Sequence, residues 1–328
     1  MFDFTVEFFK YFSAWFLIAI IFLVALLTEL FASYVLGLKS GDRNILSSYR
    51  YLRRTYREGI RLGRDVQAFY PVYFPAFAFA GLFPVCSALP YFTFIPLLEN
   101  GSDLLQIVQF LLLSDTFALI TVYSVANRES VFRVNNMIRD YICLYIPVIF
   151  LLTMLALYKI NLGELDKVFI LDSFMSIASS VENSVSLRIA VVMFSALVVS
   201  QIPHVSYKSA VYFVKSDEFT SYSGVPRILM NAWGLFRSFI VMTIVTELFF
   251  TFVSYRLFSS TDLPVWFIRL SNFLAFWLSV LLFRVIFVPL TWYIYDKIIY
   301  CVKERNRIRF VVIVSLLSSI LLMWNHWF

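Results

Sequence analysis

Ionisable residues inside long apolar stretches are the best candidates in this sequence for a chemical role. They are Glu29, Asp115, Arg237, Glu247, Arg269 and Arg284. A charged side chain among hydrocarbon groups is costly, so such residues pair with one another, face a hydrated cavity or carry protons and ions. Asp115 stands near the centre of its apolar stretch, LLLSDTFALI, and is expected to face a polar bundle interior.

Four of these residues have a simpler explanation. Arg237, Arg269 and Glu247 each lie within two turns of the end of an apolar stretch, and Arg284 lies close to one. Long side chains at such positions extend toward the headgroup region and keep the charge in water. We therefore expect these side chains to snorkel, whereas Asp115 and Glu29 are candidates for a proton path.

The composition excludes a soluble globular protein. The 328 residues are 61% hydrophobic and 15% charged, and the mean hydropathy is +0.81. An ordinary soluble domain is about 45–50% apolar and about 25% charged. This chain has too little polar surface to cover so large a core, so the apolar side chains are expected to face lipid.

Apolar stretches long enough to span a bilayer occur about eight times, since a spanning helix needs about 20 such residues. The expected spans are Ala14–Leu36, Val72–Leu97, Leu104–Val125, Tyr141–Tyr158, Ile189–Ile202, Trp233–Phe252, Val265–Leu290 and Phe310–Trp324. The second contains several prolines, so we expect it to be kinked and packed inside the bundle. The predicted fold is an all-α integral membrane bundle that forms a single domain, residues 1–328.

The basic residues predict an orientation. The connections after the odd-numbered spans contain 19 of the 27 Lys and Arg residues, and the N-terminal tail and the other connections contain 5. Positively charged loops stay on the cytoplasmic or matrix side. The N-terminus is therefore expected outside, and the basic loops inside.

Two of these inside loops have distinctive patterns. Residues 37–71 form a basic amphipathic segment in which Arg50, Arg53, Arg54 and Arg57 recur at helical spacing. This segment is expected either to anchor on anionic lipid or to dock a soluble partner. Residues 203–232 form a longer apolar and aromatic loop, which is expected to pack against protein or to line a cavity.

Metal and haem chemistry has little support in the sequence. The three cysteines, Cys86, Cys143 and Cys301, are far apart, and there are only two histidines. Neither a disulfide framework nor a metal cluster is predicted, and no nucleic-acid partner is expected because the basic residues lie in membrane loops. Any electron donor would have to belong to a partner subunit.

Four segments, Leu27–Asn44, Ala126–Pro147, Asp217–Trp233 and Leu281–Ile299, resemble motifs of the NADH dehydrogenase subunit 1 (NuoH) family, the quinone-site membrane subunit of respiratory complex I. Leu27–Asn44 is similar to LTLxERKxLGxxQxRxGPN, with Glu29 at the Glu of that motif. Ala126–Pro147 is similar to SNSxYALxGAxRxxAQxxSYEV, with Tyr145 at its Tyr. The segments Asp217–Trp233 and Leu281–Ile299 resemble the EYSG motif, through Tyr222-Ser223-Gly224, and the xxIRxxxPRxRYDQxM motif, through Arg284, Pro289, Tyr295 and Asp296.

The resemblance implies a function for the chain. The family forms part of the quinone chamber and connects the peripheral iron–sulfur and FMN subunits to the antiporter-like subunits of the mitochondrial inner membrane or the plasma membrane. It implies ubiquinone as substrate, with quinone contacts at Phe219, Tyr222, Arg227 and Tyr145. It also implies a proton-path role for Glu29, which stands at the Glu of the first motif. Asp115 and Glu247 are further candidates for a proton path because they are ionisable residues inside expected spans. Structural or docking roles are expected for Arg50, Arg53, Arg54, Arg57, Arg284 and Asp296.

The chain also departs from these motifs. The Glu after Tyr145 is Ile146, the EYSG segment begins with Ser221, and an upstream acidic cluster is nearly absent from PHVSYKSAVYFVKSD. The family uses these carboxylates in a hydrated path, so their loss places that path in question. A membrane subunit of an energy-converting hydrogenase stays open as an alternative. A secondary transporter is the alternative of another class, although no internal repeat is visible.

Overall fold

The structure is a computed structural model. It describes residues 18–29, 31–32, 35, 69–89, 103–124, 128–161, 189, 193–194, 196–198, 224–249, 265–290, 293, 297 and 306–327. These residues are almost entirely helical, and no strand occurs among them. The predicted all-α class is therefore confirmed for the described part of the chain.

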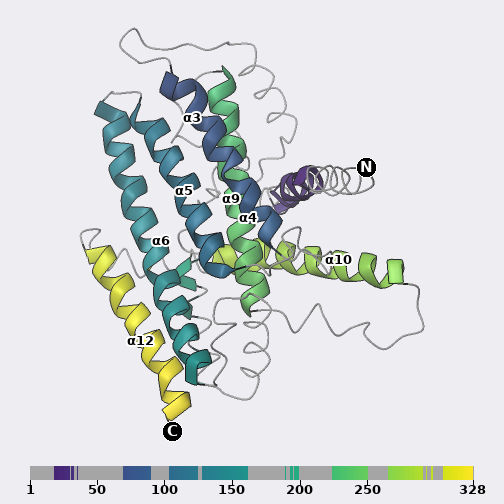
Figure 1. Cartoon of the computed structure of the whole chain (residues 1–328), viewed down its shortest axis with the longest axis vertical. Coiled ribbons are helices and arrows are strands. Elements are labelled where there is room, and N and C mark those ends of the chain that lie inside the picture. The colour runs from purple at the N-terminus through teal and green to yellow at the C-terminus, as the bar shows by residue number, and fades with distance from the viewer. Residues whose placement is uncertain are drawn as a thin grey trace, which may run out of the picture.

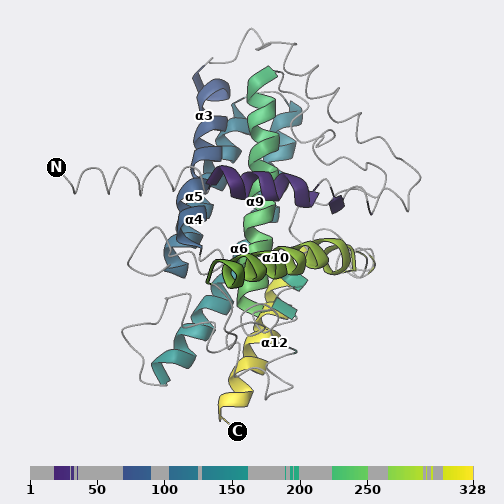
Figure 2. The ribbon, with the colours of Figure 1, turned by 90° about the vertical axis from the view of Figure 1, so that its right-hand side faces the viewer.

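The helices form an upright group that two further helices cross (Figures 1 and 2). The upright helices are α3 (Phe69–Ala80), α4 (Leu82–Ala88), α5 (Leu104–Tyr123), α6 (Arg128–Asn161), α9 (Gly224–Phe249) and α12 (Arg307–Trp327). The crossing helices are the N-terminal helix, Ile18–Glu29, and α10 (Val265–Leu282), which continues into the π-helical turn η5 (Phe283–Phe287).

Helix α9 is the centre of the bundle. Its apolar window is 83% buried, whereas the windows of α5 and α6 are 39% and 33% buried. It contacts α3, α4, α10 and η5, and its Phe236 packs edge-on against Phe22 of the N-terminal helix. Because α9 has neighbouring helices on most of its surface, its polar side chains can pair with polar side chains of those helices.

Three described helices are long and apolar enough to cross a membrane: Leu104–Tyr123, Val134–Met154 and Val225–Thr246. Shorter apolar helices occur at Ile18–Glu29, Tyr73–Ser87 and Trp277–Leu290. Membrane-helix character is thus present, while the count of eight spans stays a prediction. α5 agrees with the expected span to within two residues, and α12 to within three at each end.

The second expected span is not one continuous helix. A turn at Gly81 separates α3 from α4, and α4 ends at Ala88, while residues 90–97 of the expected span lie outside the described residues. Pro84 lacks the N–H that would bond to the carbonyl of Ala80, which weakens the helix at this turn. Gly81 also lies so close to α5 that a Cβ atom there would stand 3.1 Å from Ser114 Cβ and 3.3 Å from Ser114 Cα.

Two other helices begin earlier than predicted. α6 starts at Arg128 rather than Tyr141, and its 34 residues correspond to about 51 Å at 1.5 Å per residue. α9 starts at Gly224 rather than Trp233, so residues 224–232 are helix and not part of a loop. Both extensions carry polar residues that the hydropathy criterion excludes, although polar residues still form helix where tertiary packing supports it.

The seventh expected span has the predicted bounds but contains a wide turn. After α10, the amide N–H of Val288 bonds to the carbonyl of Phe283 instead of that of Arg284. Pro289 follows directly and cannot donate to the carbonyl of Val285, and helices commonly adjust next to a proline in this way. The turn places Arg284 on the buried side, where it is 2% exposed.

Replacement of Gly81 by Ala tests whether close contact between α4 and α5 stabilises the bundle. The new methyl group would meet two backbone atoms, Ser114 Cα and Phe77 O at 3.3 Å, which cannot rotate away. We expect a loss of about 1–3 kcal/mol, the usual cost of overpacking, measured as a lower unfolding midpoint of the purified protein.

Gly234→Ala is the matched control for that experiment. A Cβ at Gly234 meets no described atom within 4 Å, and Ala is favoured over Gly within a helix by about 1 kcal/mol. Gly234→Ala should therefore leave the midpoint unchanged or raise it. Equal midpoints for the two variants would contradict the close α4–α5 packing.

Candidate functional site

A buried carboxylate–guanidinium pair joins α5 to α9. Nε of Arg237 donates to Oδ1 of Asp115 at 2.5 Å, and Nη2 donates to Oδ2 at 2.7 Å. Asp115 is 1% exposed and Arg237 is 4% exposed. The two parallel bonds match the planar guanidinium to the planar carboxylate, which is the strongest geometry available to such a pair.

Aromatic side chains surround this pair. Tyr145 of α6 donates its hydroxyl proton to Oδ2 of Asp115 at 2.8 Å. The guanidinium carbon of Arg237 lies 5.0 Å from the ring centre of Tyr141 and 5.7 Å from that of Trp233, within the range of cation–π attraction. The carboxylate and the guanidinium are therefore satisfied on several sides without bulk water.

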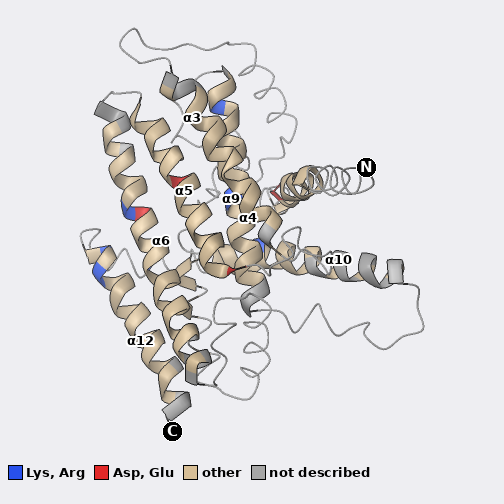
Figure 3. Ribbon diagram, in the orientation of Figure 1, with Lys and Arg blue, Asp and Glu red and all other residues tan. Residues whose placement is uncertain are grey.

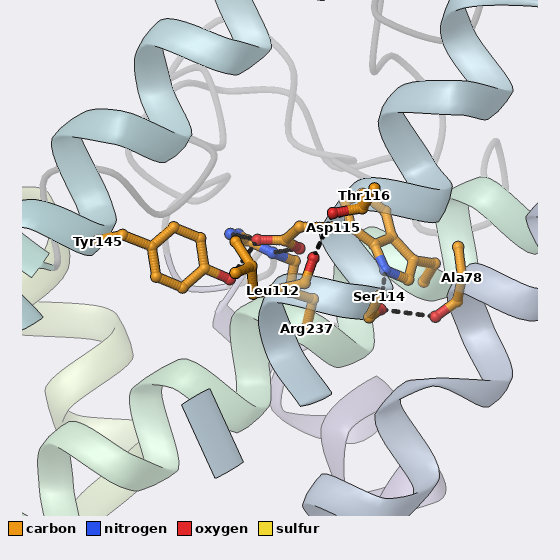
Figure 4. A network of polar contacts seen from close by, with 8 residues as sticks. Ala78, Leu112, Ser114, Asp115, Thr116, Tyr145 and Arg237 are labelled. Atoms are coloured by element: carbon orange, nitrogen blue, oxygen red, sulfur yellow. Dashed lines mark hydrogen bonds and ion pairs between the residues drawn. The ribbon is translucent and has the colours of Figure 1, made fainter. Parts of the chain in front are cut away.

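A second polar chain lies beside the pair on α5. Trp233 Nε1 donates to Ser114 Oγ at 2.8 Å, and Ser114 Oγ donates to the carbonyl oxygen of Ala78 at 2.6 Å. Figure 4 shows Tyr145, Asp115 and Arg237 on one side of α5, with Ser114 turned toward Ala78 on the other. Ser114 and Asp115 are adjacent in sequence, so α5 is attached to α3, α6 and α9 at a single level.

A second buried pair joins the N-terminal helix to the end of α10. Nε of Arg284 donates to Oε1 of Glu29 at 2.7 Å, and Nη2 donates to Oε2 at 3.1 Å. One residue earlier on the N-terminal helix, Thr28 accepts a hydrogen bond from Trp277 Nε1 at 2.9 Å. Glu29 is 6% exposed.

A third pair differs from these two in exposure. Nη1 of Arg307 on α12 donates to Oδ1 of Asp140 on α6 at 2.7 Å, but the Asp140 side chain is 42% exposed. Figure 3 shows a basic position on α12, adjoining basic and acidic positions on α6, and an acidic position on α5. Solvent screens an exposed pair, so this contact contributes little to stability.

The two buried pairs correct the snorkelling interpretation of Arg237 and Arg284. Both side chains turn inward onto carboxylates, because an unpaired Asp115 or Glu29 at these positions would cost more than keeping the arginine out of water. Arg284 was expected to have a structural or docking role, and in the structure it is buried and paired with Glu29 of the same chain. The expectation that Asp115 faces a polar interior is confirmed.

Sequence reasoning predicted Asp115 and Glu29 but could not assign their partners. The partners lie 122 and 255 residues away along the chain, at distances that no local spacing rule covers. The available signal was the count of charges in the apolar stretches: a buried acid requires a buried base.

Other predicted residues are only partly described. Arg227 lies in the first turn of α9 and is half-buried. Glu247 and Arg269 lie on α9 and α10, but their side chains are outside the described residues. Also outside are Phe219, Tyr222, Arg50, Arg53, Arg54, Arg57 and Asp296.

The chemistry available at the described site concerns protons and charge. Within the described ranges no group of His, Cys, Asp and Glu is arranged to hold a metal ion, and Cys86 and Cys143 are buried thiols. A carboxylate can release or accept a proton only when its arginine moves away or its hydrogen bonds rearrange. Asp115 and Glu29 are therefore candidate proton-binding groups, and each is paired with a buried arginine.

Comparison with known proteins does not assign a family. No protein-family description matches this chain, and no curated protein matches it.

Asp115→Asn tests the energetic role of the first pair. The substitution leaves the Arg237 guanidinium buried without a counter-charge, and breaking a buried pair typically costs about 3–5 kcal/mol. We expect a large fall in the unfolding midpoint in detergent. The double variant Asp115→Leu with Arg237→Met should recover most of the loss, because two apolar side chains of similar size leave no unpaired charge.

Asp140→Asn is the matched control for the same measurement. It removes the same charge from a pair whose carboxylate is 42% exposed, for which about 0–1 kcal/mol is expected. If Asp115→Asn were no more destabilising than Asp140→Asn, the buried pair would not be holding the bundle together.

Proposed function

We propose that this chain is the NADH dehydrogenase subunit 1-type membrane subunit of a proton-translocating NADH:ubiquinone oxidoreductase of the mitochondrial inner membrane. In this role it forms the membrane side of the quinone chamber and connects the peripheral redox arm to the proton-pumping membrane arm. Ubiquinone is the substrate, and FMN and the iron–sulfur clusters belong to partner subunits.

The Glu29–Arg284 pair is the observation that carries the proposal. Glu29 comes from the first of the four motif-like segments and Arg284 from the last, and they form a bidentate buried contact. The contact brings together the first and the last of the four segments, as expected if both contribute to one buried site. It supports the proposal because the two residues that match charged motif positions are paired with each other.

The second pair supports the same proposal. Tyr145, from the second segment, bonds to Asp115, and Arg237 follows four residues after the third segment ends at Trp233. Asp115 thus supplies a carboxylate next to Tyr145, where the family motif has a Glu and this chain has Ile146. We assign Asp115, Glu29 and Glu247 to the proton-carrying groups of this subunit.

The quinone head group is assigned to the segment that leads into α9. Phe219, Tyr222 and Arg227 are the proposed wall residues, and a quinone site needs such a small number of polar groups beside an apolar tunnel. Tyr145 already donates its proton to Asp115, so Tyr222 and Arg227 are the better donors to a quinone oxygen. The basic segment with Arg50, Arg53, Arg54 and Arg57, together with Asp296, is assigned to docking of the peripheral arm.

Purification in mild detergent tests the complex as a whole. The proposal expects iron–sulfur subunits and antiporter-like membrane subunits to co-purify with this chain, together with NADH:quinone reductase activity. Co-purification of a nickel–iron hydrogenase would favour the hydrogenase-type alternative. A chain that purifies alone and supports solute transport would identify a secondary transporter and overturn the proposal.

Tyr222→Phe tests the quinone assignment within the purified complex. Loss of one hydrogen bond to the quinone head, at about 1.4 kcal/mol, corresponds to about a tenfold fall in quinone reductase activity. NADH oxidation by a hydrophilic artificial acceptor should be unchanged, because that reaction does not use the quinone chamber.

Tyr123→Phe is the matched control, since Tyr123 ends α5 and is 61% exposed. It should leave both activities intact. If Tyr222→Phe lowered both activities equally, the residue would be needed for assembly and not for quinone contact.

A further inference from the structure

Positive charge is concentrated where α12 begins beside α6. Nη1 of Arg307 donates to Asp140 of α6, and Arg139 precedes Asp140 on that helix. Arg139 and Arg307 also act electrostatically on the same buried thiol, that of Cys143, so both lie near it. Arg309 comes two residues after Arg307 on α12 and is exposed. We call Arg139, Arg307 and Arg309 the arginine cluster.

The sequence before α12 carries the same charge. Lys303–Arg309 reads KERNRIR, with four basic residues and one acidic residue. This segment belongs to the basic connections that are expected on the inside of the membrane. Groups of four or more Lys and Arg directly before an apolar helix on that side are typical of segments that attract anionic lipid headgroups.

Beyond the arginine cluster, the exposed face of α12 is apolar. Ile313, Leu316 and Ile320 follow Arg309 at spacings of three and four residues, so they lie on the same side of the helix. All three are exposed. Another face of α12 packs along α6, whose Val134–Met154 stretch is long and apolar enough to cross a membrane. The apolar face of α12, Ile313, Leu316 and Ile320, therefore extends from a positive end beside a candidate membrane helix.

We propose that the arginine cluster binds the phosphate of an anionic phospholipid whose acyl chains lie along the apolar face of α12. Guanidinium groups present paired N–H donors that match phosphate oxygens. Asp140 balances one of the three arginines, which leaves two positive charges in excess among the described residues here. This excess selects an anionic headgroup over a zwitterionic one. The inference depends on the membrane-helix character of the chain and not on the proposed function.

Arg309→Gln tests the site in the purified full-length protein. Phosphatidylglycerol and phosphatidylcholine with identical acyl chains are added in mild detergent, and bound lipid is measured by native mass spectrometry. The unaltered protein should bind phosphatidylglycerol more tightly. Arg309→Gln should bind it about fivefold more weakly, which corresponds to the usual contribution of one basic side chain near an anionic headgroup. Equal binding of the two lipids by the unaltered protein would overturn the proposal.

Lys297→Gln is the matched control for the loss of charge. Lys297 is exposed, and its ammonium nitrogen lies 4.7 Å from the ring centre of Tyr293, outside the arginine cluster. This variant should keep the affinity of the unaltered protein for phosphatidylglycerol. Equal losses in Lys297→Gln and Arg309→Gln would indicate attraction spread over the basic surface and would contradict a defined site.

Asp140→Asn changes the charge of the site in the opposite direction. It removes the carboxylate that balances Arg307, so phosphatidylglycerol should bind about fivefold more tightly. The pair is partly exposed and contributes little to stability, so the fold is expected to persist. A merely structural role of these residues predicts no such gain, and weaker binding by Asp140→Asn would refute the proposal.

Inorganic phosphate distinguishes a lipid site from an ion site. Phosphate has the charge of the headgroup but no acyl chains to cover the apolar face of α12. An excess of phosphate at constant ionic strength should therefore leave phosphatidylglycerol bound. Displacement of the lipid by phosphate would show that the arginines bind the anion alone and would exclude a lipid-specific site.

Discussion

The burial of the Asp115 carboxylate is the constraint on which the upright bundle depends. A carboxylate in the middle of an apolar helix cannot reach water, and it can stay ionised only beside a fixed positive charge. Arg237 supplies that charge from the most buried helix of the molecule, and Tyr145 adds a hydroxyl from a third helix. The three helices long and apolar enough to cross a membrane therefore meet at one level, because the pair requires contributions from each.

Small residues make this meeting possible. Gly81 and Ala78 allow α3 and α4 to approach α5 closely enough for Ser114 to bond to a backbone carbonyl. Close approach of helix backbones through small residues is the usual way in which membrane helices associate, since lipid provides little hydrophobic drive between them. Packing and polar bonding are coupled here: a wider spacing at Gly81 would move Ser114 and, with it, the neighbouring Asp115.

The crossing helices are joined by a second buried ion pair. Glu29 and Arg284 neutralise each other where the N-terminal helix meets η5, and Thr28 with Trp277 fixes the adjacent turn. Each pair is electrically neutral as a unit, which lowers the cost of burying its two charged groups.

The sequence by itself determined the membrane-helix character, the helical class, the approximate positions of α5, α10 and α12, and the burial of Asp115. These follow from local composition, because a run of apolar residues and an acid in its middle have the same meaning in any fold. Tertiary structure alone decided that Arg237 and Arg284 face inward, that α9 begins at Gly224 and that the second span breaks at Gly81. An arginine near a helix end can reach headgroups or a buried acid equally well, and only the position of a carboxylate more than a hundred residues away selects between them.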